Sequence, residues 1–336
     1  MNPGDPAPAE PAATRREFLR RSAMAGAAAA AAGGLGAWLV NRHPPGDFSR
    51  LHSADARRDF SARSPGPLMA IATGRDRPGM LRRALGAMGG IERFIKRGDR
   101  VMVKVNAAFA APAMLGATTN PELLSELVRL CLAVGASSVV VTDNPINAPE
   151  SCFELTGIGP AARAAGAALY VPGEGSFRSA TLKGASLIRD WPVLDAPFAG
   201  VTKLIGVAPV KSHQRAGASM TMKNWYGLLG GRRNQFHQDI DGIIVELSMM
   251  VRPTLVVLDG TDSMMANGPT GGSLADLRET NTLVVSTDAV AADSLGATLL
   301  GKTFRELPYL VRASELGLGT ADFESLRPER VPAPAA

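Results

Sequence analysis

A segment near the middle of the chain carries several side chains that can hold an anion and move a proton. It contains Lys211, His213, Thr221, Lys223 and Asn224. Lysine attracts anions, threonine and asparagine orient a ligand through hydrogen bonds, and histidine transfers protons near neutral pH or binds a metal. Thr221 and Asn224 share a face if the segment is helical, because they lie three residues apart. The segment predicts a carboxylate or phosphate site, and a solvated basic surface is the alternative.

Other polar residues follow apolar stretches that have the character of β-strands. They are Lys104 and Asn106 at stretch 101–105, Asp143 after 138–142, Lys211 after 203–210, Asp259 after 254–258 and Asp288 after 282–286. In an open α/β sheet the carboxyl ends of parallel strands form the ligand crevice, so these side chains are expected to converge there. For any single aspartate, ordinary turn and helix-cap chemistry is the alternative.

These positions suggest roles for the individual residues. Lys104, Lys211 and Lys223 are expected to bind the substrate anion, Asn106, Thr221 and Asn224 to orient it, and His213, Asp259 and Asp288 to act as the catalytic groups. In this scheme His213 is the general acid or base, and the two aspartates complete the proton or metal machinery. A metal bound by His213 and His237 is a weaker alternative, because the two histidines lack the close spacing typical of a metal site.

The elements that must position these residues alternate between strands and helices. Apolar stretches typical of strands occupy residues 68–73, 101–105, 138–142, 169–171, 203–210, 254–258 and 282–286. The clearest helix covers residues 121–134, with Thr119 as its expected N-cap and Glu122 completing a capping box. Continuous apolar strands separated by helices predict an α/β fold, a single large domain with a mainly parallel sheet covered by helices on both faces.

The site segment and several shorter motifs resemble a known family. The motifs are Lys104-Val-Asn106, Thr118-Thr-Asn-Pro121, Lys211-Ser-His213 with Thr221 and Lys223-Asn-Trp-Tyr-Gly227, and Ser286-Thr-Asp-Ala-Val-Ala-Ala-Asp293. In these motifs the chain resembles the domain-of-unknown-function family 362 over residues 68 to about 315. The chain departs from the family where Lys-Pro-Asn reads Lys104-Val105-Asn106, and it lacks the ferredoxin cysteines of some members. The resemblance implies a site and a fold and assigns no reaction.

The amino-terminal residues have the features of an export signal. Arg15 and Arg16 precede Phe18 and Leu19, and a small-residue apolar run covers residues 23–40. This order resembles a twin-arginine (Tat) signal peptide, so the export machinery is an expected partner and the periplasm the expected location. An uncleaved leader would tether the protein to the inner membrane. The expected organisation is a signal at 1–40, a disordered linker at 41–66, the α/β domain at 67–326 and a tail at 327–336.

The composition of the chain limits which partners and cofactors are expected. The formal net charge is +5, and no run of lysines and arginines occurs in the body of the chain, so nucleic acid is not an expected partner. Cys131 and Cys152 are the only cysteines, too few for an iron–sulfur cluster held by four thiolates. Cys131 continues an apolar helical stripe and is expected to be buried, and a disulfide with Cys152 is left open. No cofactor is identified from the sequence.

Two functions follow from these observations. The leading one is an exported enzyme that acts on a small anionic substrate in a crevice lined by lysine, histidine, asparagine and aspartate. The alternative is a periplasmic protein that binds or delivers a small anion, a metal or a cofactor. A redox protein is a further candidate partner.

Overall fold

A computed structural model describes residues 54–62 and 65–333 of the chain. The strands are β1 (Ala54–Asp55), β2 (Arg58–Asp59), β3 (Met69–Thr73), β4 (Arg100–Lys104), β5 (Ser138–Thr142), β6 (Ala168–Tyr170), β7 (Phe177–Thr181), β8 (Trp191–Leu194), β9 (Lys203–His213), β10 (Gly217–Ser219), β11 (Val251–Arg252), β12 (Leu255–Met264), β13 (Leu277–Ser286) and β14 (Glu329–Val331). The helices are α2 (Arg77–Ala87), α3 (Pro121–Ala133), α4 (Pro149–Leu155), α5 (Ile158–Ala164), α6 (Thr221–Asn224), α7 (Ile240–Met250), α8 (Ala289–Leu299) and α9 (Pro308–Glu315).

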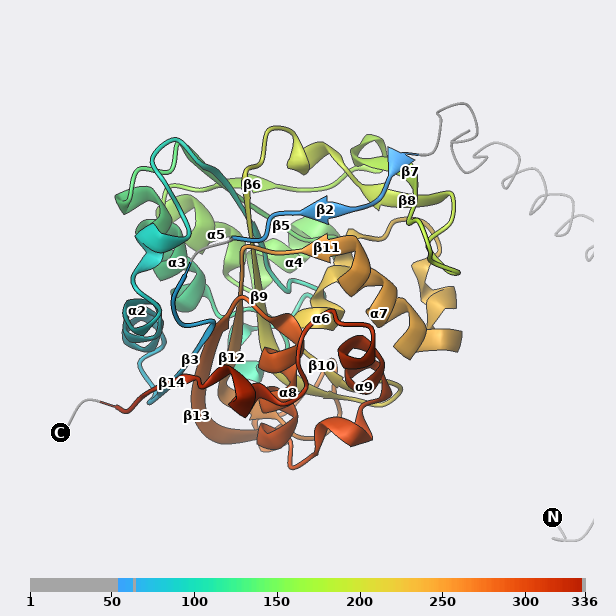
Figure 1. The fold of residues 1–336 in the computed structure, drawn as a ribbon. Helices are drawn as coiled ribbons and strands as arrows, with labels where there is room; N and C mark the ends of the chain where they lie inside the picture. The colour runs from blue at the N-terminus through green and yellow to red at the C-terminus, as the bar shows by residue number, and fades with distance from the viewer. Residues whose placement is uncertain (1–53, 63–64, 334–336) are drawn as a thin grey trace, which may run out of the picture. The chain divides into compact units, whose positions relative to one another are not determined.

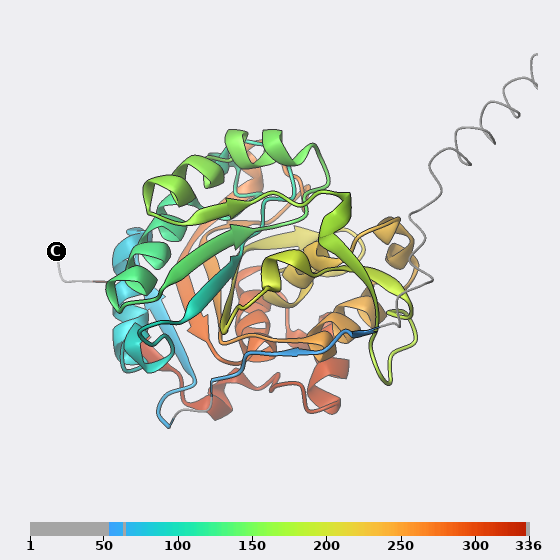
Figure 2. The ribbon, with the colours of Figure 1, turned by 90° about the horizontal axis from the view of Figure 1, so that it is seen from above.

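The main sheet has nine strands in the order β14-β3-β13-β12-β9-β4-β5-β6, with β10 paired to the end of β9. The pairs β12/β9, β9/β4, β4/β5 and β5/β6 are parallel. Helices cover both faces (Figures 1 and 2), with α2, α3 and α5 on one side and α6, α7, α8 and α9 on the other. The prediction of a mostly parallel α/β fold is therefore confirmed.

Each face of the sheet has its own apolar core because side chains alternate along the strands. In β4 the buried Met102 belongs to the core shared with α6 to α9, whereas its neighbours Val101 and Val103 belong to the core under α2, α3 and α5. Strands buried on both faces consist of continuous apolar residues, and this is the pattern by which the sequence revealed them.

The chain changes direction across the sheet between β4 and β9. From β4 it proceeds outward to β5 and β6, and it then returns to the other side of β4 to form β9 and, beyond it, β12. In α/β sheets such a switch point leaves a crevice at the carboxyl ends of the two adjacent strands. Lys104 ends β4, while Lys211 and His213 end β9, so the topology brings these residues to one place.

One strand runs against the predicted direction. β13 is antiparallel to both of its neighbours, β12 and β3, and its last residue, Ser286, pairs with Val256 near the start of β12. The carboxyl end of β13 therefore lies beside the amino-terminal ends of its neighbours, on the opposite side of the sheet's strand ends from the carboxyl ends of β9 and β12. Apolar runs do not record strand direction, and β12 and β13 are joined without a helical crossover.

Three local expectations are corrected by the structure. Residues 54–62, assigned to a disordered linker, include β1 and β2, which pair with β7 and β11 and bury Ala56. The expected tail contributes β14, which pairs with β3. Asn120 caps α3 in place of Thr119, since its side chain accepts hydrogen bonds from the backbone of Glu122 and Leu123. The remainder of the expected linker and the export signal lie outside the described residues, apart from residues 65 and 66.

Candidate functional site

A cavity of about 80 Å³ lies at the carboxyl ends of β4, β5 and β9. That volume exceeds the space that one water molecule needs. The lining residues are Lys104, Asn106, Ala108, Phe109, Asp143, Asn144, Ile146, Lys211, His213, Ser219, Lys223, Asn224, Tyr226, Gly227, Arg233, His237 and Pro269. Four of them are lysines or arginines and one is a carboxylate, so the cavity has an excess of positive charge.

Lys104 and Asp143 form a buried ion pair at the floor of this cavity. Their Nζ and Oδ1 atoms are 2.6 Å apart, and both side chains are almost inaccessible to solvent. Asp143 also accepts hydrogen bonds from the backbone N–H groups of Ala107 and Asn144. Burial lowers the pKa of Lys104, while the neighbouring Asp143 carboxylate acts in the opposite direction. Asp143, the one carboxylate among the described residues that line the cavity, is therefore already neutralised by Lys104.

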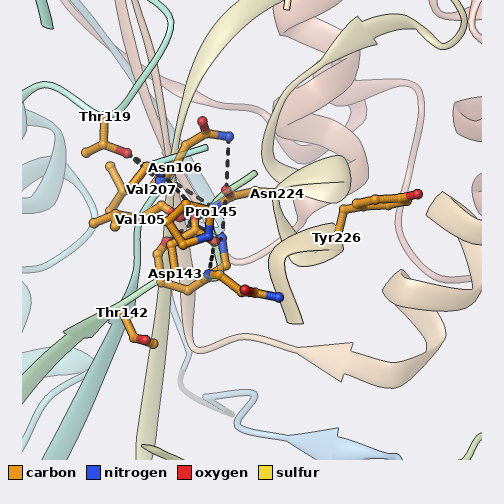
Figure 3. Close-up of polar contacts among 12 residues, drawn as sticks. Val105, Asn106, Thr119, Thr142, Asp143, Pro145, Val207, Asn224 and Tyr226 are labelled. Atoms are coloured by element: carbon orange, nitrogen blue, oxygen red, sulfur yellow. Dashed lines mark hydrogen bonds and ion pairs between the residues drawn. The ribbon is translucent and has the colours of Figure 1, made fainter. Parts of the chain in front are cut away.

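Asn224 joins β4 to β9 through both ends of its side-chain amide. Its Nδ2 donates to the backbone carbonyls of Lys104 and Val207, each at 3.2 Å, and its Oδ1 accepts from Lys104 Nζ and Asn106 Nδ2. Figure 3 shows Asn106, Asp143 and Asn224 gathered at these strand ends. All four hydrogen-bonding positions of the Asn224 amide are used by the protein itself. Asn224 therefore holds the strand ends together, whereas the sequence had suggested that it orients a ligand.

The other two lysines have no carboxylate partner within the described part of the chain. Lys211 Nζ donates to the carbonyl of Ala117 at 2.6 Å and lies 3.4 Å from Asn106 Oδ1. Lys223 is only partly buried, and its Nζ lies 5.0 Å from the centroid of the Tyr226 ring. Burial, together with neighbouring positive charge, lowers the pKa of Lys211 to about 7 and that of Lys223 to about 8.

His213 is held in one protonation state by the turn that follows β9. Its Nδ1 accepts hydrogen bonds from the backbone N–H groups of Arg215 and Ala216, at 3.2 and 3.1 Å. A ring nitrogen that accepts carries no proton, so the neutral ring has its proton on Nε2. Burial, reinforced by nearby cations, lowers the pKa of His213 to about 3. His213 is therefore a neutral ring that can donate a hydrogen bond from Nε2, and its expected role as general acid or base stays a prediction.

The second histidine stacks on the first. The rings of His213 and His237 are 6.2 Å apart between centroids and inclined by 16°. Among residues 54–62 and 65–333 no group of three or more histidine, cysteine, aspartate or glutamate side chains is arranged to hold a metal ion. Asp259 and Asp288, which were expected to complete the proton or metal machinery, do not line the cavity with the two histidines.

The comparisons with known proteins place this fold and site in a family. The profile of a domain of unknown function, DUF362, matches residues 101–298. The chain belongs to the DUF362 family. A thylakoid-associated protein of Synechocystis sp. is 24% identical over 246 residues, which are 71% of this chain and 74% of that protein. The DUF362 match begins in β4 and ends in α8, and it therefore includes every residue that lines the cavity.

No helix that the structure describes is both long enough and apolar enough to cross a membrane. This finding applies to the DUF362 domain and the segments that flank it, and the expected leader lies outside it. The match to a thylakoid-associated protein gives a location for that protein alone.

Three of the predicted site residues lie outside the cavity of the DUF362 domain. Thr221 donates its hydroxyl hydrogen bond to Asp293, whose carboxylate also accepts from the backbone N–H groups of Thr221 and Met222. Asp259 pairs with Arg77 of α2 at 2.8 Å. Asp288 caps α8 through Ala291 and also accepts from the backbone of Thr320. The helix-cap alternative is thus the observed one for Asp288, because β13 ends at the opposite edge of the sheet.

The remaining predicted residues do converge, and the structure adds others. Lys104, Asn106, Lys211, His213, Lys223, Asn224 and His237 all line the cavity. Asp143 was expected to converge with them but was given no role, and Arg233 was not anticipated. Asp143 directly follows β5, and this was the same signal that selected the other aspartates. Arg233 follows no strand and stands in no motif, so the sequence offered no comparable signal for it. In the structure its guanidinium donates to backbone carbonyls, among them those of Asn144 and Pro145.

The last glycine of the Lys-Asn-Trp-Tyr-Gly motif is explained by this packing. A Cβ atom at Gly227 would lie 2.1 Å from Asp143 Oδ1 and 2.9 Å from Lys104 Nζ. Contacts that short require one of the buried ionic groups to move. The Lys-Asn-Trp-Tyr-Gly motif therefore combines one lysine of the cavity, Lys223, with a glycine that allows the backbone to approach the ion pair.

The cysteines have no part in the cavity. Cys131 and Cys152 are both free and buried, in α3 and α4 respectively. Burial raises the pKa of the Cys131 thiol to about 12, so it remains protonated near neutral pH. The expected burial of Cys131 is confirmed.

Proposed function

We propose that this DUF362 protein is an enzyme that binds a small anionic substrate in the cavity at the carboxyl ends of β4, β5 and β9. The observation that carries the proposal is the charge of the cavity. Lys104, Lys211, Lys223 and Arg233 line it, and Asp143 is the single opposing carboxylate. Buried cations are normally paired, and the missing negative charge is one that an anionic ligand would supply.

The lowered pKa values of Lys211 and Lys223 support this reading. Desolvation and neighbouring cations disfavour the charged form of both lysines, and a bound anion would offset both effects. Anion binding should therefore take up protons between about pH 7 and pH 9. The donor at His213 Nε2 and the partly exposed ammonium of Lys223 would contact the ligand, whereas Lys104 and Asn224 would maintain the geometry.

The affinity for anions should fall as the pH rises. Below about pH 7 both lysines are charged before binding, and affinity is at its maximum. Above that value they lose protons, and affinity should drop by about tenfold per pH unit while one lysine titrates. Isothermal titration of phosphate, acetate and pyruvate between pH 6 and pH 9, repeated in buffers of different ionisation enthalpy, measures both the affinity and the proton uptake.

The absence of binding by any of these anions at pH 6, or an affinity that rises with pH, would contradict the proposal. Binding together with turnover in the parent, and loss of turnover with retained affinity in His213→Gln, would support an enzyme. A high affinity without turnover of any tested substrate would favour the alternative, a protein that binds or delivers the anion.

We further propose that the protein acts after export through the twin-arginine route. The support is the order of Arg15, Arg16, Phe18, Leu19 and the apolar run in the sequence. Replacing Arg15 and Arg16 by lysine should retain the protein in the cytoplasm. Cell fractionation with an antibody to the protein measures this, and export that is unaffected by the double substitution would contradict it.

A further inference from the structure

The side-chain nitrogen of Lys211 has hydrogen-bond partners that suit a neutral amine. A neutral amine has two N–H donors and one lone pair, whereas an ammonium has three donors and no lone pair. Lys211 Nζ has two oxygen neighbours, the carbonyl of Ala117 at 2.6 Å and Asn106 Oδ1 at 3.4 Å. Its third neighbour is the Phe109 ring, with the centroid at 5.5 Å. The two oxygens can accept both hydrogens of the amine and leave its lone pair unoccupied.

The charges around Lys211 favour the same neutral state. The groups that act on it are Lys223 from α6, Lys104 from β4 and Asp143, which follows β5. Asp143 is 2.6 Å from Lys104 and is neutralised by it, so the surroundings of Lys211 are net positive. A lysine that is desolvated beside other cations becomes a nucleophile near neutral pH.

We propose that Lys211 is a nucleophile that forms an imine with the carbonyl carbon of a small 2-oxo carboxylate bound in the cavity. This inference rests on the proposed function, because the substrate carboxylate would be held by Lys223. It adds a substrate class, a carbonyl next to an anionic group, and a covalent step.

The step balances without an additional reactant. The Lys211 lone pair attacks the carbonyl carbon, a C–N bond forms, and the C–O π bond becomes an oxyanion that accepts a hydrogen bond from His213 Nε2. One proton of the attacking nitrogen transfers to that oxygen to give a carbinolamine. The C–O bond then breaks, and the second N–H proton passes to the departing hydroxyl, so that it leaves as water. The products are one imine and one water molecule. A neutral histidine that donates to a substrate oxygen is a known way to polarise a carbonyl.

The other two lysines are less suited to this role. Lys104 donates to Asp143, to the Val105 carbonyl and to Asn224, so its three donors are occupied and no lone pair is free. Lys223 has no oxygen partner in the described chain and is the group available to attract a carboxylate. Lys211 is fully buried and its pKa is lowered, whereas Lys223 is only partly buried.

Reductive trapping tests the proposal. The full chain is incubated with pyruvate and sodium cyanoborohydride at pH 6, 7.5 and 9, and adducts are located by peptide mass spectrometry. We expect one 1-carboxyethyl group on Lys211, formed faster at pH 7.5 than at pH 6, where the amine is protonated. Lys211→Met should lose this label, whereas Lys183→Met, which changes an exposed lysine, should retain it.

The mapping in the parent protein decides the question even if Lys211→Met fails to fold. Labelling spread over exposed lysines, or concentrated on Lys223, would overturn the proposal. Anion binding by titration calorimetry together with an unlabelled Lys211 would also overturn it while leaving the proposed function intact. If no anion binds at all, the proposed function fails first.

Discussion

Asp143→Asn is expected to lower the free energy of unfolding by about 3–5 kcal/mol, the range observed when one partner of a buried ion pair is removed. Both carboxylate oxygens accept hydrogen bonds, one from Ala107 N–H and the other from Lys104 and Asn144 N–H. An amide in this position must turn its NH₂ group toward a donor in either orientation. Lys104 would then remain buried without a counter-charge.

Urea unfolding measured for four proteins separates the ion pair from its surroundings. These are the parent, Asp143→Asn, Lys104→Met and the double variant. The double variant should be more stable than the sum of the two single changes predicts, since it contains no unpaired buried charge. A loss below about 1 kcal/mol for Asp143→Asn would mean that water reaches the pair and that the described burial is incorrect.

Lys223→Met is expected to weaken anion binding by about 10- to 150-fold without lowering stability. A hydrogen bond to a charged group contributes about 1.5–3 kcal/mol, and every 1.4 kcal/mol corresponds to about a tenfold change in affinity. Lys223 has no oxygen partner among the described residues, so its removal breaks no internal hydrogen bond. It also removes a positive charge that acts on Lys211, and the pKa of Lys211 should therefore rise.

Calorimetric titration of phosphate at pH 6.5 measures the affinity, and urea unfolding measures the stability. Lys183→Met is the matched control, because it makes the same change at an exposed position. Equal affinity in Lys223→Met and the control would place the ligand elsewhere. Asp143→Asn is thus expected to change stability, and Lys223→Met is expected to change anion binding.

The sequence was most informative where strands are buried on both faces. Continuous apolar runs located β4, β5 and β9 to within a few residues, because such strands cannot alternate with polar positions. Strand direction left no comparable signal, so β13 was taken as parallel. That single reversal removed Asp288 from the site and placed it at the start of α8.

Within the site, the sequence identified which residues converge better than it identified their roles. Lys104 and Asn224 were selected as ligand-binding groups, yet each is occupied by internal partners. Pairing of this kind depends on which strands become neighbours, and that information is distributed over the whole chain. The protonation of His213 depends on the three-residue turn after β9, whose backbone N–H directions a sequence pattern does not specify.

The position of β3 also has a consequence for the time at which this domain can form. β3 ends at Thr73, while its partners β13 and β14 begin at Leu277 and Glu329. At typical rates of synthesis of about 5–20 residues per second, β3 leaves the ribosome roughly 10–40 s before β13 exists. Its apolar residues must be shielded during that interval. The sheet therefore cannot be completed until β13 and β14 have been synthesised, and any route that carries the domain in folded form can act only after that point.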